Sequence, residues 1–208
     1  MCGIISLFGD KRIVPGNMLN HRGPDDYHSV TLGKCQMDFY RLSINDISPA
    51  GMQPFVGEGH MFMCNGEIYN HKQYETGNEK SKSDCEVVMN MINKLGMMKT
   101  VESLNGDFAM VYTDGERVLA ARDPVGVRPM FYTRYSSNSI AFASEAKALL
   151  FLESHIEVFP PGYIYDSYVD NFICYHSGYW DVQKHITNYT IEDVRSNLEK
   201  AVHLRLEN

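Results

Sequence analysis

Short apolar runs between turn-forming residues dominate the chain, and they predict β-strands. The runs are rich in Ile, Val, Phe and Tyr, which favour the pleated backbone of a sheet. Turn signals such as TDGE, RYSSNS and FPPG separate the later runs. Strands spaced this closely favour antiparallel pairing. The expected strands cover residues 4–8, 36–42, 61–65, 108–114, 117–123, 130–135, 139–144 and 162–167.

Helical periodicity is confined to a few segments. Ser83-Asp84-Cys85-Glu86 has the spacing of a capping box, and an apolar face follows it until Gly96. That face comprises Val87, Val88, Met91, Ile92 and Leu95. A second helix is expected over residues 97–104 and a short one over 145–151. Together these helices should cover the sheets.

The last segment differs from the rest of the chain. After Trp180 comes a polar stretch, and residues 190–206 then carry an apolar stripe at helical spacing. A lone amphipathic helix needs a surface to pack on, so it either docks on the preceding domain or begins another one. We therefore expect one domain over residues 1–181, with a linker and an amphipathic helix over 182–208.

Composition and charge exclude several classes of function. The chain has 208 residues, enough for one good core, and its apolar share of 44% is ordinary for a globular domain. The balance of 19 basic and 26 acidic residues gives a net charge of -7, which argues against nucleic acid as a partner. No apolar run approaches the roughly 20 residues of a membrane span. Residues 1–10 lack the features of a signal peptide, so the cytoplasm is the expected location.

Neither a metal site nor a disulfide framework is expected. The five cysteines are odd in number and never form a CxxC pair, and the eight histidines form no HxxxH or HExxH motif. Four cysteines lie in predicted strand or helix runs and are interpreted as core packing: Cys35, Cys64, Cys85 and Cys174.

The opening MCGI places a cysteine where reactive chemistry is possible. Once Met1 is removed, Cys2 carries a nucleophilic thiol and a free α-amine on one residue. An α-amine titrates near about 7.7–8.0, so part of it can act as a base at neutral pH. The alternative is an ordinary buried cysteine near a terminus, and this motif alone does not decide between them.

Four further segments hold residues that packing does not require: HRGPDD (21–26), RLSIND (41–46), NGEIYN (65–70) and SDCE (83–86). Arg41 can hold a carboxylate, Asn65 and Gly66 offer converging donors, and Asp84 stands at a helix start. Each has a structural alternative: a surface ion pair, a hairpin turn, a first-turn acid or a fixed loop. Their occurrence together with Cys2 favours a functional site.

This set resembles the glutaminase domain of class II glutamine amidotransferases, and most closely that of asparagine synthetases. The resemblance covers about residues 1–181 and rests on MCGI, HRGPD, RLSIND, NGEIYN, SDCEVV, LNGDFAMVYTD, ARDPVGVRPMFY, FASEAKAL and FPPG in the family's order. It implies an α+β fold of the N-terminal-nucleophile hydrolase type, a four-layer α/β/β/α sandwich of two antiparallel sheets.

The resemblance also implies roles for individual residues in hydrolysing L-glutamine to L-glutamate and ammonia. Cys2 would be the nucleophile, and Asn65 with Gly66 would form the oxyanion hole. Arg41 would bind the α-carboxylate of glutamine and Asp84 its α-ammonium. The remaining pocket residues would be Leu42, Ser43, Ile44, Asn45 and Glu67.

The sequence contains no SGG-x-DS pyrophosphate loop, which an asparagine synthetase would need for its second reaction. The expected glutaminase reaction requires no cofactor, while ATP and Mg would belong to a synthetase domain or subunit acting in trans. Two alternatives stay open: the glutaminase of another class II system, such as one feeding purine or amino-sugar synthesis, or a non-catalytic glutamine-binding or interaction module.

Overall fold

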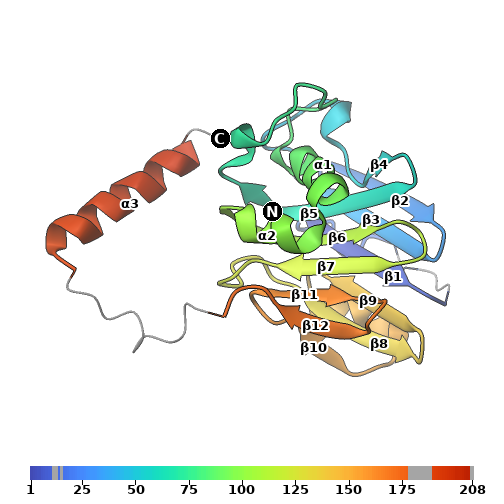
Figure 1. Ribbon diagram of the computed structural model, residues 1–208. Coiled ribbons are helices and arrows are strands. Elements are labelled where there is room, and N and C mark those ends of the chain that lie inside the picture. The colour runs from blue at the N-terminus through green and yellow to red at the C-terminus, as the bar shows by residue number, and fades with distance from the viewer. Residues whose placement is uncertain (11–13, 15, 178–188, 207–208) are drawn as a thin grey trace.

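The computed structural model describes residues 1–10, 14, 16–177 and 189–206, and its body is two antiparallel β-sheets stacked face to face (Figure 1). Within these residues each sheet has six strands. The first sheet has the order β10-β8-β9-β1-β3-β2, with bounds Ile156–Val158, Phe131–Ser136, Ser139–Ala143, Gly3–Phe8, Cys35–Arg41 and Asp26–Leu32. The second has the order β12-β11-β7-β6-β5-β4, with bounds Asn171–Cys174, Tyr163–Asp166, Val118–Arg122, Gly106–Thr113, His60–Ile68 and Phe55–Gly57.

All eight strands expected from the sequence are present, and four further strands were not predicted. The four are β2, β4, β10 and β12, and they occupy the four edges of the two sheets. Three of them have only three or four residues, and β2 is largely exposed on both faces. Short or polar strands are typical of sheet edges, and they lack the apolar pattern by which the central strands were recognised.

Side-chain alternation along the strands divides the core into layers. Met61 and Met63 of β5 face the first sheet and join the core between the two sheets. Phe62 and Cys64 face outward, against α1 (Asp84–Leu95) and α2 (Met97–Ser103). Full burial of each such apolar side chain contributes roughly 1.5–3 kcal/mol.

The outer face of the first sheet is covered more thinly. Leu149 and Leu152 of η3 (Ala146–Leu152) pack on it together with Leu19. The four layers expected from the sequence are therefore present. The helix predicted over residues 145–151 is a 3₁₀ helix that begins and ends one residue later.

Helix α1 begins as the sequence predicts but is capped differently. The Ser83 hydroxyl accepts a hydrogen bond from Cys85 N at 3.3 Å. Glu86 does not complete a capping box, because its carboxylate instead accepts the backbone N–H of Ser81 at 2.7 Å. Leu95, expected on the apolar face, is exposed.

Helix α3 (Ile191–Leu206) stands beside the sandwich in Figure 1. None of its side chains is buried, so its apolar stripe does not dock on the domain. Near its C-terminal end, the guanidinium carbon of Arg205 lies 4.4 Å from the centre of the Tyr69 ring. The expected domain boundary at residue 181, and Trp180, lie outside the described residues. Among those residues, no helix combines the length and the apolar character needed to cross a membrane.

Candidate active site

Three central strands direct their inward-facing side-chain rows to one end of the sandwich. Alternation along each strand places every second side chain on the inner face. Next to β1, Cys2 continues the inward-facing row of Ile4 and Phe8. In β3, Arg41 continues the row of Met37 and Phe39. In β5, Asn65 continues the row of Met61 and Met63. The end of the apolar core is therefore where three polar side chains converge.

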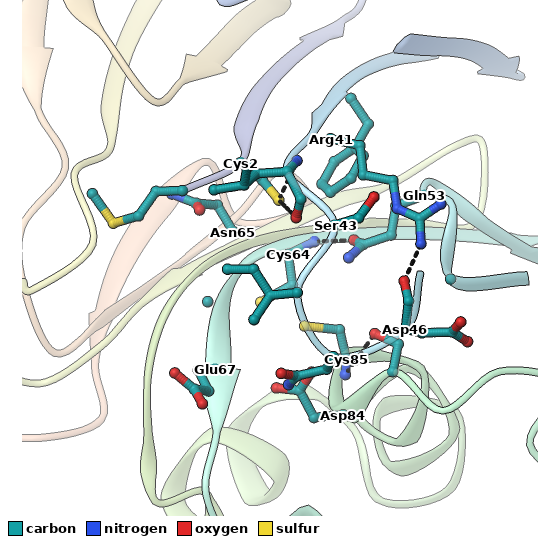
Figure 2. Close-up of a pocket in the computed structure, with 18 of the residues that line it drawn as sticks. Cys2, Arg41, Ser43, Asp46, Gln53, Cys64, Asn65, Glu67, Asp84 and Cys85 are labelled. Atoms are coloured by element: carbon teal, nitrogen blue, oxygen red, sulfur yellow. Dashed lines mark hydrogen bonds between the residues drawn. The ribbon is translucent and has the colours of Figure 1, made fainter. Parts of the chain in front are cut away.

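These side chains open into a pocket (Figure 2). The pocket brings together every residue that the sequence proposes for catalysis or substrate binding: Cys2, Arg41, Leu42, Ser43, Ile44, Asn45, Asn65, Gly66, Glu67 and Asp84. Their roles stay predictions, but the fold gathers them from four separate segments of the chain.

The Cys2 thiol is held at the mouth of the sandwich core. It exchanges hydrogen bonds with the backbone of Leu42, whose N–H lies 3.4 Å and whose carbonyl oxygen lies 3.5 Å from Sγ. Arg22 fixes the Cys2 backbone by donating from Nε to its carbonyl oxygen at 3.0 Å. Burial raises the pKa of the Cys2 thiol, and the Leu42 hydrogen bond offsets part of that rise. This shift favours the thiol form of Cys2 over the thiolate.

Asn65 presents an amide donor with no protein partner. Asn65 is 2% exposed, and within the described residues its buried Nδ2 donates to no acceptor. Strand β5 continues through Asn65 and Gly66 to Ile68, so the hairpin-turn interpretation of this dipeptide is wrong. Gly66 pairs with Phe108, and a Cβ at Gly66 would lie 2.4 Å from the Asp107 carbonyl oxygen.

Arg41 brings a buried positive charge to the pocket. Its side chain is 6% exposed, and one guanidinium nitrogen donates to the carbonyl oxygen of Asp46. Gly51 leaves room for it, because a Cβ there would lie 2.8 Å from Nη2. In the described parts of the chain no carboxylate forms an ion pair with Arg41, so the surface ion pair considered from the sequence is not formed.

Asp84 brings a buried carboxylate to the same pocket, as the first residue of α1. Its Oδ2 accepts the Ile68 N–H at 2.6 Å, and its Oδ1 accepts from Asn45 Nδ2 at 3.3 Å. Burial raises the pKa of Asp84, against the lowering effect of these hydrogen bonds. No lysine or arginine of the described chain pairs with it. Arg41 and Asp84 thus bring a cation and an anion to the pocket, and neither forms a salt bridge among the described residues.

Comparison with known proteins now identifies the family. A family described as "glutamine amidotransferase domain" matches residues 1–170. The chain belongs to the glutamine amidotransferase family. This amidotransferase domain is 34% identical to asparagine synthetase [glutamine-hydrolyzing] 1 of Saccharomyces cerevisiae, over 99% of this chain and 39% of that protein. It is 31% identical to the human asparagine synthetase, over 95% of this chain and 42% of that protein. The chain therefore spans about two fifths of the length of these relatives.

Two solved structures share the fold. Glutamine phosphoribosylpyrophosphate amidotransferase from B. subtilis superposes with a TM-score of 0.71 at 17% identity, over 85% of this chain and 50% of that chain. A second structure, described as the allosteric regulatory enzyme of purine biosynthesis, gives a TM-score of 0.72 at 16% identity, with the same coverage. At such identities the likeness shows the fold alone, and it confirms the predicted N-terminal-nucleophile hydrolase architecture.

Sequence reasoning missed several residues around the pocket of this amidotransferase domain. Gln53 is 5% exposed and accepts the Cys64 N–H on Oε1 at 2.7 Å, which holds β5 next to Asn65. No local motif marks it. Cys64 and Cys85 are buried, as expected, but they also line the pocket. Cys174 is exposed, so its interpretation as core packing is wrong.

Across the described residues, no group of three or more His, Cys, Asp or Glu side chains is arranged to hold a metal ion.

Proposed function

We propose that the domain hydrolyses L-glutamine to L-glutamate and ammonia through a γ-glutamyl thioester on Cys2. The observation that carries the proposal is the set of groups around one thiol. In the described chain the Arg41 cation and the Asp84 anion form no salt bridge, and the Asn65 amide donor has no hydrogen-bond partner. A buried charge without a partner is costly. A zwitterionic amino acid supplies both missing counter-ions, and a side-chain amide extending from it supplies a carbonyl oxygen for Asn65.

In the proposed reaction the sulfur of Cys2 attacks the amide carbon of glutamine. The α-amine of Cys2, free once Met1 is removed, takes the thiol proton and passes it to the leaving nitrogen. The tetrahedral oxyanion is stabilised by Asn65 Nδ2 and by the Gly66 N–H. Ammonia leaves, and a water molecule then attacks the thioester, which releases glutamate and restores the thiol. The other proposed pocket residues shape the wall: Leu42, Ser43, Ile44, Asn45 and Glu67.

The proposed destination of the ammonia is asparagine synthesis from aspartate. Support comes from the asparagine synthetase names of the relatives. The synthetase reaction, with its need for ATP and Mg, would be carried out by a synthetase domain or subunit and not by the amidotransferase domain. Transfer of ¹⁵N from amide-labelled glutamine to asparagine, with such a synthetase added, tests this part. Label found only in free ammonia would contradict it.

An assay of glutamate release from glutamine tests the hydrolysis. The intact mass of the protein, measured on the same preparation, establishes whether Met1 is absent. We expect Cys2→Ala to abolish release and Cys174→Ala, which changes an exposed cysteine away from the pocket, to preserve it. Mass spectrometry after acid quench should find the γ-glutamyl group on Cys2. Full activity of Cys2→Ala would refute the nucleophile, and full activity with Met1 retained would refute the α-amine as base.

A further inference from the structure

Two thiols beneath the pocket take no part in the proposed reaction. Cys64 on β5 and Cys85 on α1 are each 2% exposed, and both line the pocket. Both belong to the buried cluster through which α1 packs on β5. In Figure 2 Cys64 lies between Cys2 and Cys85, so the pair faces the same space as the nucleophile. Both are free thiols in this structure.

Their position in the chain connects them to the two ends of the substrate site. Cys64 immediately precedes Asn65, and Cys85 immediately follows Asp84. A covalent bond between the two sulfurs would therefore tie the strand that carries the oxyanion donor to the helix that carries the ammonium-binding carboxylate. No such constraint exists while both cysteines are thiols.

We propose that Cys64 and Cys85 are a modification site: a dithiol that oxidation converts reversibly into a disulfide, which inactivates the pocket. A disulfide bond measures about 2.05 Å between sulfurs, shorter than the van der Waals separation of two sulfur atoms that are not bonded. Closing it draws β5 and α1 together at the pocket, and Asn65 and Asp84 each lie one residue from the new bond. Placement errors of about 1 Å at an active site can lower rates by about a hundredfold.

The oxidant we name is hydrogen peroxide. One thiol, as thiolate, attacks a peroxide oxygen; the O–O bond breaks, and the products are a sulfenic acid and one water. The second sulfur attacks the sulfenic sulfur, the S–S bond forms, and a second water leaves. In total, two thiols and one peroxide give one disulfide and two waters. An external dithiol returns two electrons and two protons by exchange.

The environment sets the rate of this step. The neighbouring Cys64 thiol and burial raise the pKa of the Cys85 thiol well above its ordinary value. Because the thiolate is the reactive form, oxidation should be slow at neutral pH and should accelerate as the pH rises. Bound glutamine would cover the pocket and slow it further.

Disulfide mapping in a Cys2→Ala chain tests the site without involving the nucleophile or any activity. After peroxide treatment, alkylation of free thiols and digestion without reductant, we expect a cross-linked peptide pair containing Cys64 and Cys85. Cys35, which is fully buried in the core between the sheets, should stay free. Failure to find the cross-link, with both cysteines still alkylated or overoxidised singly, would overturn the proposal.

The effect on activity rests on the proposed glutaminase function and is measured separately in the chain with Cys2 intact. Peroxide should lower glutamate release at least tenfold, and dithiothreitol should restore it. Cys64→Ser and Cys85→Ser, each compared with its own untreated activity, should resist the treatment. If peroxide inactivates both variants as strongly as the parent chain, the loss of activity comes from oxidation of Cys2, and the proposal that the Cys64–Cys85 disulfide inactivates the pocket is overturned. A chain inactive before treatment would instead contradict the proposed function, while the mapping result would stand.

Discussion

Replacing Asn65 by alanine should separate catalytic turnover from stability. Asn65 Nδ2 is one of two proposed oxyanion donors, and loss of one such donor costs about 2.7–4 kcal/mol of transition-state stabilisation, or roughly 10²–10³ in kcat. The same Nδ2 is buried with no partner in the described chain. A buried unpaired donor carries a desolvation penalty of about 1–3 kcal/mol, which alanine removes. We therefore expect kcat to fall steeply while the free energy of unfolding stays constant or rises.

Two measurements on the same preparation check this: glutamate release at saturating glutamine, and urea unfolding of the ligand-free protein. Asn65→Asp is the matched control, because it keeps the shape but sets an acceptor where the oxyanion forms. It should be at least as inactive as the alanine variant. Turnover of Asn65→Ala within a few-fold of the parent would refute the oxyanion assignment. A large loss of stability would show instead that Nδ2 has a structural partner.

Three further outcomes are expected. Arg41→Ala should raise KM for glutamine about 10–100-fold with a smaller change in kcat, because a charged hydrogen bond contributes roughly 1.5–3 kcal/mol. An unchanged KM in initial-rate assays would contradict the binding of the glutamine carboxylate by Arg41. For Asp84, whose pKa burial raises, protonation removes the charge that pairs with the ammonium. Steady-state KM should therefore rise as the pH falls through that raised pKa, by at most about tenfold per pH unit, and Asp84→Asn should abolish the dependence. Gln53→Leu leaves the Cys64 N–H unpaired, so it should lower the free energy of unfolding by about 1–3 kcal/mol and reduce kcat. Gln53→Glu retains an acceptor for the Cys64 N–H, so it should restore both the free energy of unfolding and kcat. Equal thermal midpoints for Gln53→Leu and Gln53→Glu would contradict the proposed role of this hydrogen bond.

The sequence predicts the centre of each sheet and misses its borders. Central strands such as β1 and β6 are buried on both faces and therefore read as continuous apolar runs. The edge strand β2, DYHSVTL, pairs on one side only and is largely exposed, so its composition resembles a loop. It forms because β3 offers a free row of backbone donors and acceptors, and no local pattern in residues 26–32 encodes that partner.

The site divides in a similar way. Residues within distinctive short motifs, such as Cys2 and Asn65, could be nominated from the sequence because packing does not explain them. Gln53 could not, because its role depends on reaching the backbone of Cys64 across the pocket wall. Cys64 and Cys85 were correctly predicted to be buried. That they also share the pocket follows from how α1 packs on β5, which neither segment reveals alone.

The unmatched groups of the pocket support one another as an argument for the substrate. A single buried charge without a counter-ion could reflect a local compromise in packing. Here the Arg41 cation, the Asp84 anion and the Asn65 donor come from different segments and face the same pocket. Among the described residues neither charge forms a salt bridge, and the Asn65 amide nitrogen has no hydrogen-bond partner. Folding must supply the free energy that keeps all three dehydrated. A ligand with a carboxylate, an ammonium and a carbonyl oxygen would return that free energy on binding, while a ligand lacking any one of these groups would leave a buried group unmatched. The pocket should therefore reject glutarate and 4-aminobutyramide more strongly than contact area alone predicts, and competition of these analogues with glutamine measures that rejection.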